Sequence, residues 1–220
     1  MPQEIPPAVT AQYGFNHMGD IAWDRREGGR VLLPLECYTP GAPNGGNTCG
    51  RGAIGVADAG TLQWRYLVLL DRRQIAKAMW AEVSPDGRLL WTSSGRDLLA
   101  YRVAAIARRR AGRTIRAVRR LRRAVPRTGV TGATFHRGRL LLAGQRGGLF
   151  EVWSVNLSTG RRRLEIQRRL SGESEGLAMV GGTLRWIVTP FDPAGRPPTY
   201  PGTGNALLAF RPRQARRRRP

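Results

Sequence analysis

The chain has 220 residues, of which 41% are hydrophobic, so it is long enough and apolar enough to bury a core. It carries 37 Lys and Arg residues against 15 Asp and Glu residues, a formal net charge of +22. No run of about 18 apolar residues that could span a membrane is present, and no signal peptide is readable in the N-terminal sequence MPQEIPPAVTAQYGF. The sequence therefore predicts a cytoplasmic protein if it is complete, and an exported or extracellular one if a leader is missing.

One pattern occurs four times along the chain: a short apolar strand, a tight glycine turn and a second apolar strand. In chain order the copies read IAWDRREGGRVLLPLE (21–36), AEVSPDGRLLWTSS (81–94), GATFHRGRLLLAGQ (132–145) and GLAMVGGTLRWIV (176–188). Strand units repeated every 40 to 60 residues or so are typical of a β-propeller built from four-stranded blades. The predicted fold class is all-β: a β-propeller or propeller fragment with about four recognisable four-stranded blades.

The positions of the copies give the predicted organisation. An N-terminal extension (1–15) precedes the propeller (16–211), and a disordered basic tail follows (212–220). The four blades are expected at 16–70, 78–125, 130–170 and 174–211.

Segment 104–125 allows two interpretations. Its residues Ile115, Val118, Leu121 and Val125 lie at helical spacing with arginines between them. A propeller would place the outermost strand of a blade there, and we favour this strand with a long basic loop beside it.

Two cysteines, Cys37 and Cys49, bracket a loop rich in Gly, Asn and Pro. A disulfide between them would close this loop and remove chain entropy worth roughly 2–3 kcal/mol. Such a pair is the pattern expected of an exported protein. We therefore predict the disulfide; the alternative is two free thiols.

Acidic residues recur where the innermost strands of a propeller would begin. Asp20, Glu82 and Glu175 stand at these entrances, and Glu36 ends the second strand of the first copy. Carboxylates that converge at a channel mouth need a counter-charge, which a hard cation with oxygen ligands supplies. The sequence thus predicts a metal site with Asp20, Glu36, Glu82 and Glu175 as candidate ligands and Ca²⁺ as the candidate cofactor. The alternative is that these acids cap turns or pair with arginines.

His17 is the candidate catalytic residue, as a metal ligand or a general base beside these acids. No motif of a serine hydrolase, zinc protease, P-loop protein or dinucleotide-binding protein is present. The six tryptophans fall on predicted strands, where packing between blades is their expected role.

The arginines are concentrated in three runs. Segments 108–127, 161–169 and 211–219 contain ten, five and six of them, and without these 21 the net charge would be near +1. The candidate polyanion-binding residues are Arg216, Arg217, Arg218 and Arg219. The runs lack interleaved aromatic residues and match no DNA-reading motif, so no specific nucleic-acid partner is expected.

The start NHMGDIAWD, the turn SPDGRLLW and the entrance ESEGLAMV resemble the calcium-type six-bladed propellers, the phytase-like, NHL-like and gluconolactonase-like group, in an actinobacterial-type, exported form. The resemblance implies Gly19-Asp20 and Glu175-Gly176 at blade entrances. Because four blades are few and the first copy begins close to the N-terminus, we expect either a compact four- or five-bladed ring or a propeller truncated at its N-terminus. The leading functional hypothesis is a monomeric binding or scaffold propeller for an unknown small molecule or protein. The alternatives are a metal-dependent hydrolase of esters, lactones or phosphoesters and an arginine-driven polyanion binder.

Overall fold

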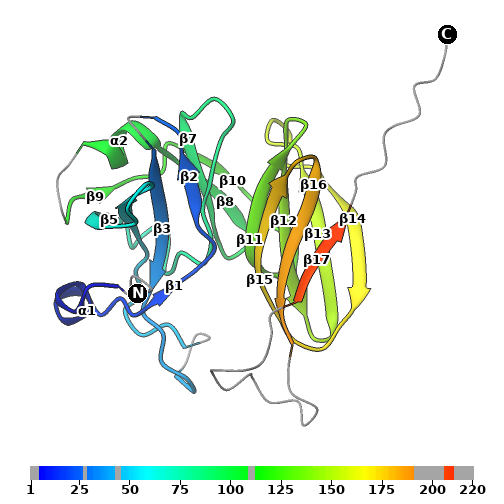
Figure 1. Ribbon diagram of the computed structural model, residues 1–220, viewed down its shortest axis with the longest axis horizontal. Helices are drawn as coiled ribbons and strands as arrows, with labels where there is room; N and C mark the ends of the chain where they lie inside the picture. Colours follow the sequence, from blue (N-terminus) through cyan, green and yellow to red (C-terminus); the bar gives the residue numbers. More distant parts are fainter. Residues whose placement is uncertain (1–4, 27–28, 43–45, 109–111, 191–205, 211–220) are drawn as a thin grey trace.

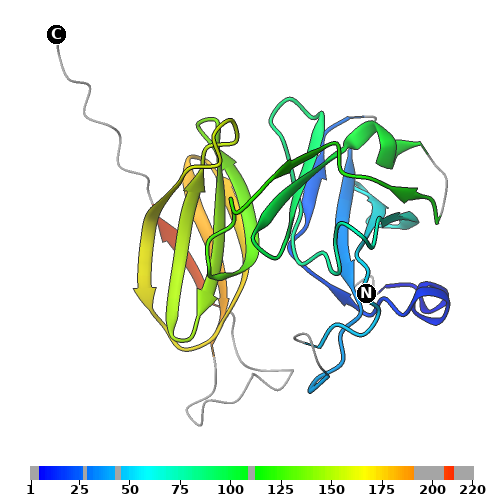
Figure 2. The same ribbon diagram turned by 180° about the vertical axis from the view of Figure 1, so that it is seen from behind.

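The computed structural model describes residues 5–26, 29–42, 46–108, 112–190 and 206–210. Within them the chain forms four small antiparallel sheets in sequence order, which are the four blades of a β-propeller. Figure 1 shows blades 1 and 2 in one half of the molecule and blades 3 and 4 in the other, and Figure 2 shows the same division from behind. The prediction of an all-β propeller with four blades is confirmed.

Blade 1 has six strands and blade 2 has four. The strands of blade 1 are β1 (His17–Met18), β2 (Ala22–Asp24), β3 (Arg30–Glu36), β4 (Ala53–Asp58), β5 (Trp64–Leu70) and β9 (Thr114–Ile115). The strands of blade 2 are β6 (Glu82–Val83), β7 (Leu89–Ser94), β8 (Asp97–Arg102) and β10 (Arg119–Leu121).

Blade 3 has four strands and blade 4 has three in the described part of the chain. The strands of blade 3 are β11 (Gly129–His136), β12 (Arg139–Arg146), β13 (Leu149–Val155) and β14 (Arg162–Arg169). The strands of blade 4 are β15 (Glu173–Val180), β16 (Thr183–Thr189) and β17 (Ala206–Phe210).

The repeated glycines are explained by the hairpin turns. Gly29, Gly87, Gly138 and Gly182 have φ angles of 89°, 69°, 74° and 75°. Residues with a Cβ atom rarely adopt this left-handed conformation, whereas glycine adopts it without steric cost. The spacing of these glycines in the sequence therefore marks the first hairpin of each blade.

Apolar clusters join each blade to the next. Blades 1 and 2 share a cluster that includes Leu32 and Tyr101, and blades 2 and 3 share one around Trp80 and Trp91. Blades 3 and 4 share a cluster around Trp186. These three tryptophans are at most 1% exposed, as expected for packing between blades, whereas Trp23 is 59% exposed.

The other face of blade 1 is covered by the N-terminal helix α1 (Pro7–Tyr13). Val9 of this helix and Phe15 after it pack against Leu33 and Leu35 of β3. The predicted N-terminal extension thus contains an element that buries a sheet face. No helix of the described residues is long and apolar enough to cross a membrane.

Segment 104–125 divides between two blades. The short helix α2 (Val103–Ala107) follows β8, then β9 pairs in parallel with β5 of blade 1, and β10 pairs with β8 as the outermost strand of blade 2. The expected outer strand is present, but only over Arg119–Leu121. The extra parallel strand β9 was not expected.

The predicted disulfide is confirmed. Cys37 and Cys49 are bonded, with their Cα atoms 5.6 Å apart, and they close the loop between β3 and β4. The predicted basic tail, 212–220, lies outside the described residues, and so do Arg216, Arg217, Arg218 and Arg219.

Candidate functional site

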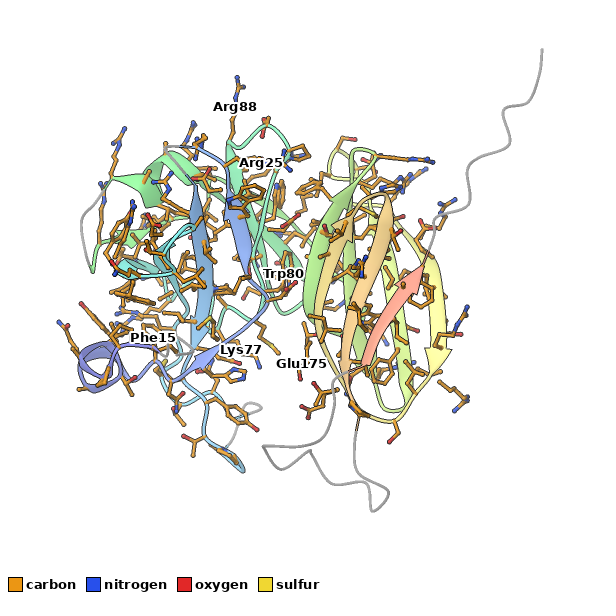
Figure 3. The ribbon with its side chains drawn as sticks, viewed as in Figure 1. Phe15, Arg25, Lys77, Trp80, Arg88 and Glu175 are labelled. Atoms are coloured by element: carbon orange, nitrogen blue, oxygen red, sulfur yellow. A yellow bond between two sulfur atoms is a disulfide. The ribbon has the colours of Figure 1, made fainter. Side chains whose placement is uncertain are left out.

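Two cavities lie at opposite ends of the innermost strands. The first, of about 230 Å³, is lined by residues at the strand entrances, among them His17, Asp20, Glu36 and Glu175. The second, of about 510 Å³, is lined by residues at the strand ends, including Trp23, Arg25 and Glu82. Figure 3 shows Lys77 and Glu175 on one side of the molecule and Arg25 and Arg88 on the other. We refer to the cavity lined by His17, Asp20, Glu36 and Glu175 as the entrance cavity.

The pairing of β1 with β3 brings His17 and Glu36 together. The two residues are direct partners across the ladder, and His17 Nδ1 lies 2.9 Å from Glu36 Oε1. Glu36 is nearly fully buried, with its side chain 3% exposed, whereas that of His17 is 49% exposed. The hydrogen bond to Glu36 raises the pKa of His17; burial lowers it, and the negative charges of Glu36 and Glu175 raise it further. The imidazole is therefore held by a buried carboxylate at the rim of the entrance cavity.

The second carboxylate oxygen of Glu36 lacks a hydrogen bond. Oε2 is buried and has no hydrogen-bonding partner among the described residues. Lys77 Nζ lies 3.8 Å from this oxygen, so the two groups form an ion pair but no hydrogen bond. A buried carboxylate oxygen left without a donor costs free energy. The residue that carries this oxygen, Glu36, lines the entrance cavity.

Glu175 of blade 4 lines the same cavity. Burial raises the pKa of Glu175, and the neighbouring charge of Glu173 adds to this rise, while His17 lowers it. The entrance cavity therefore contains carboxylates from blades 1 and 4 beside one imidazole.

Asp20 connects all four blades. Its backbone N–H donates to Met79 O at 3.1 Å, and its carbonyl accepts from Ala81 N–H at 2.9 Å, which joins blade 1 to the entrance of blade 2. Its carboxylate Oδ2 accepts the backbone N–H groups of Ala133 in blade 3, at 3.0 Å, and Leu177 in blade 4, at 3.3 Å. Burial raises the pKa of Asp20 to about 7 despite these two hydrogen bonds. The side chain predicted as a metal ligand is used as an acceptor between blades.

The glycines beside these acids allow the close approach of neighbouring blades. A Cβ atom on Gly19 would lie 1.8 Å from the carbonyl oxygen of Met79, which is an impossible contact. A Cβ atom on Gly176 would lie 2.9 Å from Asp20 Oδ1. The pairs Gly19-Asp20 and Glu175-Gly176, which the sequence marked as blade entrances, are thus contact points around the channel.

Glu82 has a similar role but lines the second cavity. Its Oε1 accepts the backbone N–H of Phe135 in blade 3 at 3.1 Å. Burial raises the pKa of Glu82 to about 7, against the hydrogen bonds from Phe135 and the Thr134 side chain. Glu82 is therefore separated from the other three candidate ligands, which share the entrance cavity.

The fit of these residues to a metal is limited in the described part of the chain. No three His, Cys, Asp or Glu residues there are grouped closely enough to hold a metal ion. Ca²⁺ takes six to eight oxygen ligands, and Asp20 Oδ2 and Glu82 Oε1 already accept backbone N–H groups. The oxygen that fits a cation best is Glu36 Oε2, which accepts no hydrogen bond from the described residues and lies 3.8 Å from Lys77 Nζ.

The sequence did not predict the second cavity or the ion pairs that Asp24 forms beside it. Asp24, at the end of β2, is fully buried and bonds the guanidinium groups of Arg26 and Arg30. Above it, the guanidinium group of Arg25 lies 5.2 Å from the centre of the exposed Trp23 ring. The adjacent residues WDRR in the first copy were the available signal.

No protein-family model matches the chain, and no curated protein matches it. Among solved structures, a chain of a nidogen–laminin complex is similar with a TM-score of 0.52 and 14% identity; the match covers 78% of this chain and 57% of that one. A Dos1 propeller and BamB from Moraxella catarrhalis are similar with TM-scores of 0.39, at 11% and 12% identity. These matches cover 78% and 88% of this chain, and 39% and 46% of the Dos1 and BamB chains. This chain therefore spans less than two thirds of the length of each. At such low identity the likeness concerns the fold alone. The four sheets in sequence order, with Asp20 of the first bonded to the third and the fourth, make this chain a β-propeller protein.

Proposed function

We propose that the protein is a binding propeller that holds a small cationic group in the entrance cavity. The observation that carries this proposal is Glu36 Oε2, a buried carboxylate oxygen without a hydrogen-bond donor among the described residues. Asp20 and Glu175 line the same cavity, so three carboxyl groups stand against one cation, the Lys77 that pairs with Glu36, when His17 is neutral. A cation would replace the missing donor and balance the carboxylates.

Two sources of positive charge have this chemistry: a protonated amine and a divalent metal ion such as Ca²⁺. The cavity of about 230 Å³ has room for either, with water completing the shell of a metal. A Ca²⁺ site here would agree with the resemblance to calcium-type six-bladed propellers. Both the Ca²⁺ site and membership of that group are part of this proposal. The disulfide Cys37–Cys49 supports an exported location, because such bonds persist in oxidising compartments.

Thermal unfolding with added cations tests the proposal. A ligand that binds only the native state at 100 times its Kd stabilises it by about 2.7 kcal/mol, which raises Tm by roughly 5–10 °C in a chain of this length. We expect this shift with CaCl₂, reversed by EDTA, or with ethanolamine hydrochloride, which EDTA does not affect. NaCl at the same ionic strength controls for salt.

Paired variants localise the effect. Glu36→Gln should abolish the shift, because an amide carries no charge to bind the cation. Glu165→Gln should keep it, because Glu165 pairs with Arg163 away from the entrance cavity. If neither cation raises Tm, or if both variants respond like the original protein, the proposal is wrong.

A hydrolase activity on esters, lactones or phosphoesters is the second candidate. The pair His17 Nδ1–Glu36 Oε1, at 2.9 Å, has the geometry of a general base oriented by a carboxylate. Turnover of a model lactone or phosphoester should then be lost in His17→Gln and follow the titration of His17 with pH. Cation binding without turnover would leave a binding protein and exclude the enzyme for these substrates.

A further inference from the structure

A groove lined by arginines lies between the outer edge of blade 1 and the helix α2. It has a volume of about 590 Å³. Figure 1 shows β5, β9 and α2 together at one edge of the molecule, far from blades 3 and 4. The groove is lined by the six arginines Arg51, Arg72, Arg73, Arg102, Arg113 and Arg116.

The arginines come from separate parts of the sequence. Arg51 precedes β4, Arg72 and Arg73 follow β5, and Arg102 ends β8 directly before α2. Arg113 and Arg116 flank β9, which pairs in parallel with β5. Two backbone hydrogen bonds hold β9 beside β5: Leu69 N–H donates to Arg113 O at 2.8 Å, and Asp71 N–H donates to Ile115 O at 3.0 Å. The unexpected strand β9 is therefore the element that completes the groove.

Positive charge in the groove exceeds negative charge. Asp71 is the only acidic residue among those that line it. Its Oδ2 accepts Arg116 Nε at 2.9 Å, and its Oδ1 accepts the backbone N–H of Arg73 at 3.0 Å. Among the described residues no carboxylate forms an ion pair with the other five arginines. Like charges that line one groove repel one another, and a multiply charged anion would offset this repulsion.

We propose that this groove binds a compact small molecule that carries several phosphate groups. The planar guanidinium fork donates two parallel hydrogen bonds to a phosphate group, which makes arginine the preferred residue for such ligands. The groove falls in the volume range of small-molecule sites, about 300–1,000 Å³, so its size favours a compact ligand over an extended chain. This site is separate from the entrance cavity, with which it shares no residue.

Calorimetric titration with tripolyphosphate at constant ionic strength tests the proposal. We expect binding of one tripolyphosphate per chain, with inorganic phosphate and sulfate binding much more weakly because each engages fewer arginines. Affinity should fall as salt is raised, since the contacts are ionic.

Charge-matched variants separate the groove from general basicity. Arg102→Gln with Arg113→Gln removes two groove charges, while Arg88→Gln with Arg185→Gln removes two exposed charges elsewhere. The groove variant should lose roughly tenfold or more in affinity, because charge-assisted hydrogen bonds to phosphate are lost, and the control should lose much less. Equal losses in both variants, no saturable binding, or groove-dependent binding of a sulfated heparin oligosaccharide but not of tripolyphosphate would each overturn the proposal.

Discussion

At the scale of single residues, the acids near the channel do two different kinds of work. Asp20 and Glu82 accept backbone N–H groups from neighbouring blades, and so they hold the blades in register. Glu36 and Glu175 line the entrance cavity, and Glu36 keeps one oxygen without a donor among the described residues. All four are acidic residues in the sequence, and only their hydrogen-bonding partners in the structure distinguish the two roles.

Stability should decrease as pH rises from 5 to 8. Burial raises the pKa values of Asp20 and Glu82 to about 7, from ordinary values of 3.8 and 4.5. Between the ordinary and the raised pKa values, the native state binds more protons than the unfolded state. The free energy of unfolding therefore falls as pH rises through this range. His17 acts in the same direction, because its pKa is raised and its stabilising contribution is lost as pH increases through that value.

Thermal unfolding at pH 5 and pH 8 measures this effect. We expect a Tm lower at pH 8 by on the order of 5 °C, and a smaller difference in Asp20→Asn and Glu82→Gln, whose amides do not titrate. Glu165→Gln serves as the control and should keep the full difference. An unchanged pH dependence in the two channel variants would show that these carboxyls ionise normally.

At the scale of elements, the loop between β3 and β4 is closed by its own covalent bond. Cys37 ends a buried stretch at the edge of blade 1, near Phe15 and the helix α1. Thr48 N–H donates to Cys37 O at 3.2 Å, and Asn47 Nδ2 donates to Ala76 O at 2.7 Å, so the loop is also hydrogen-bonded at its base. The disulfide thus closes a loop that begins directly after Glu36, which lines the entrance cavity.

Removal of this disulfide should destabilise the protein without abolishing the fold. The bond closes a loop with a sequence separation of 12, and loss of such a bond costs about 2–4 kcal/mol. The variant Cys37→Ser with Cys49→Ser should therefore melt roughly 5–15 °C lower. A reducing agent should lower the Tm of the original protein to a similar value and leave the variant unaffected. Two thiols titrating in the unfolded, unreduced protein would contradict the bond itself.

At the scale of the whole molecule, three apolar clusters carry the contacts between successive blades, and most arginines of the basic runs that the structure describes are exposed. Within the described residues the exposed strand β14 carries the run 161–169, and β9 and β10 carry part of the run 108–127. In the part of the chain that the structure describes, these arginines therefore lie on strands at the edges of their sheets, where they contribute little to packing.

Deletion of residues 212–220 should leave Tm within about 2 °C of the original value. The segment has no apolar side chain except Ala215, so it has little to offset the entropy of ordering, about 1–2 kcal/mol per residue for the backbone. It carries five of the arginines, including the predicted polyanion-binding Arg216, Arg217, Arg218 and Arg219. The shortened protein should therefore elute from heparin at a lower salt concentration. A Tm loss of many degrees would mean that the tail contributes a strand to the fold.

The sequence by itself determined the fold class, the hairpins and the disulfide. These depend on local chemistry: glycine at the left-handed turn positions, alternating apolar residues in the strands, and two cysteines at the ends of one loop. It also predicted that Asp20, Glu36, Glu82 and Glu175 converge near His17. Three of these acids share the entrance cavity with His17 and Glu82 lines the other cavity, while their roles in metal binding or catalysis stay predictions.

Only the tertiary structure decided which of these residues share a cavity and which hydrogen bonds they form. Contacts such as Asp20 with Leu177 join residues 157 positions apart, and their partners are backbone N–H groups that every residue has. The arginine groove is a similar case, because Arg51, Arg102 and Arg113 meet only when β9 pairs with β5. Strand pairing over such distances depends on packing of the whole molecule, and no local pattern in the sequence records it.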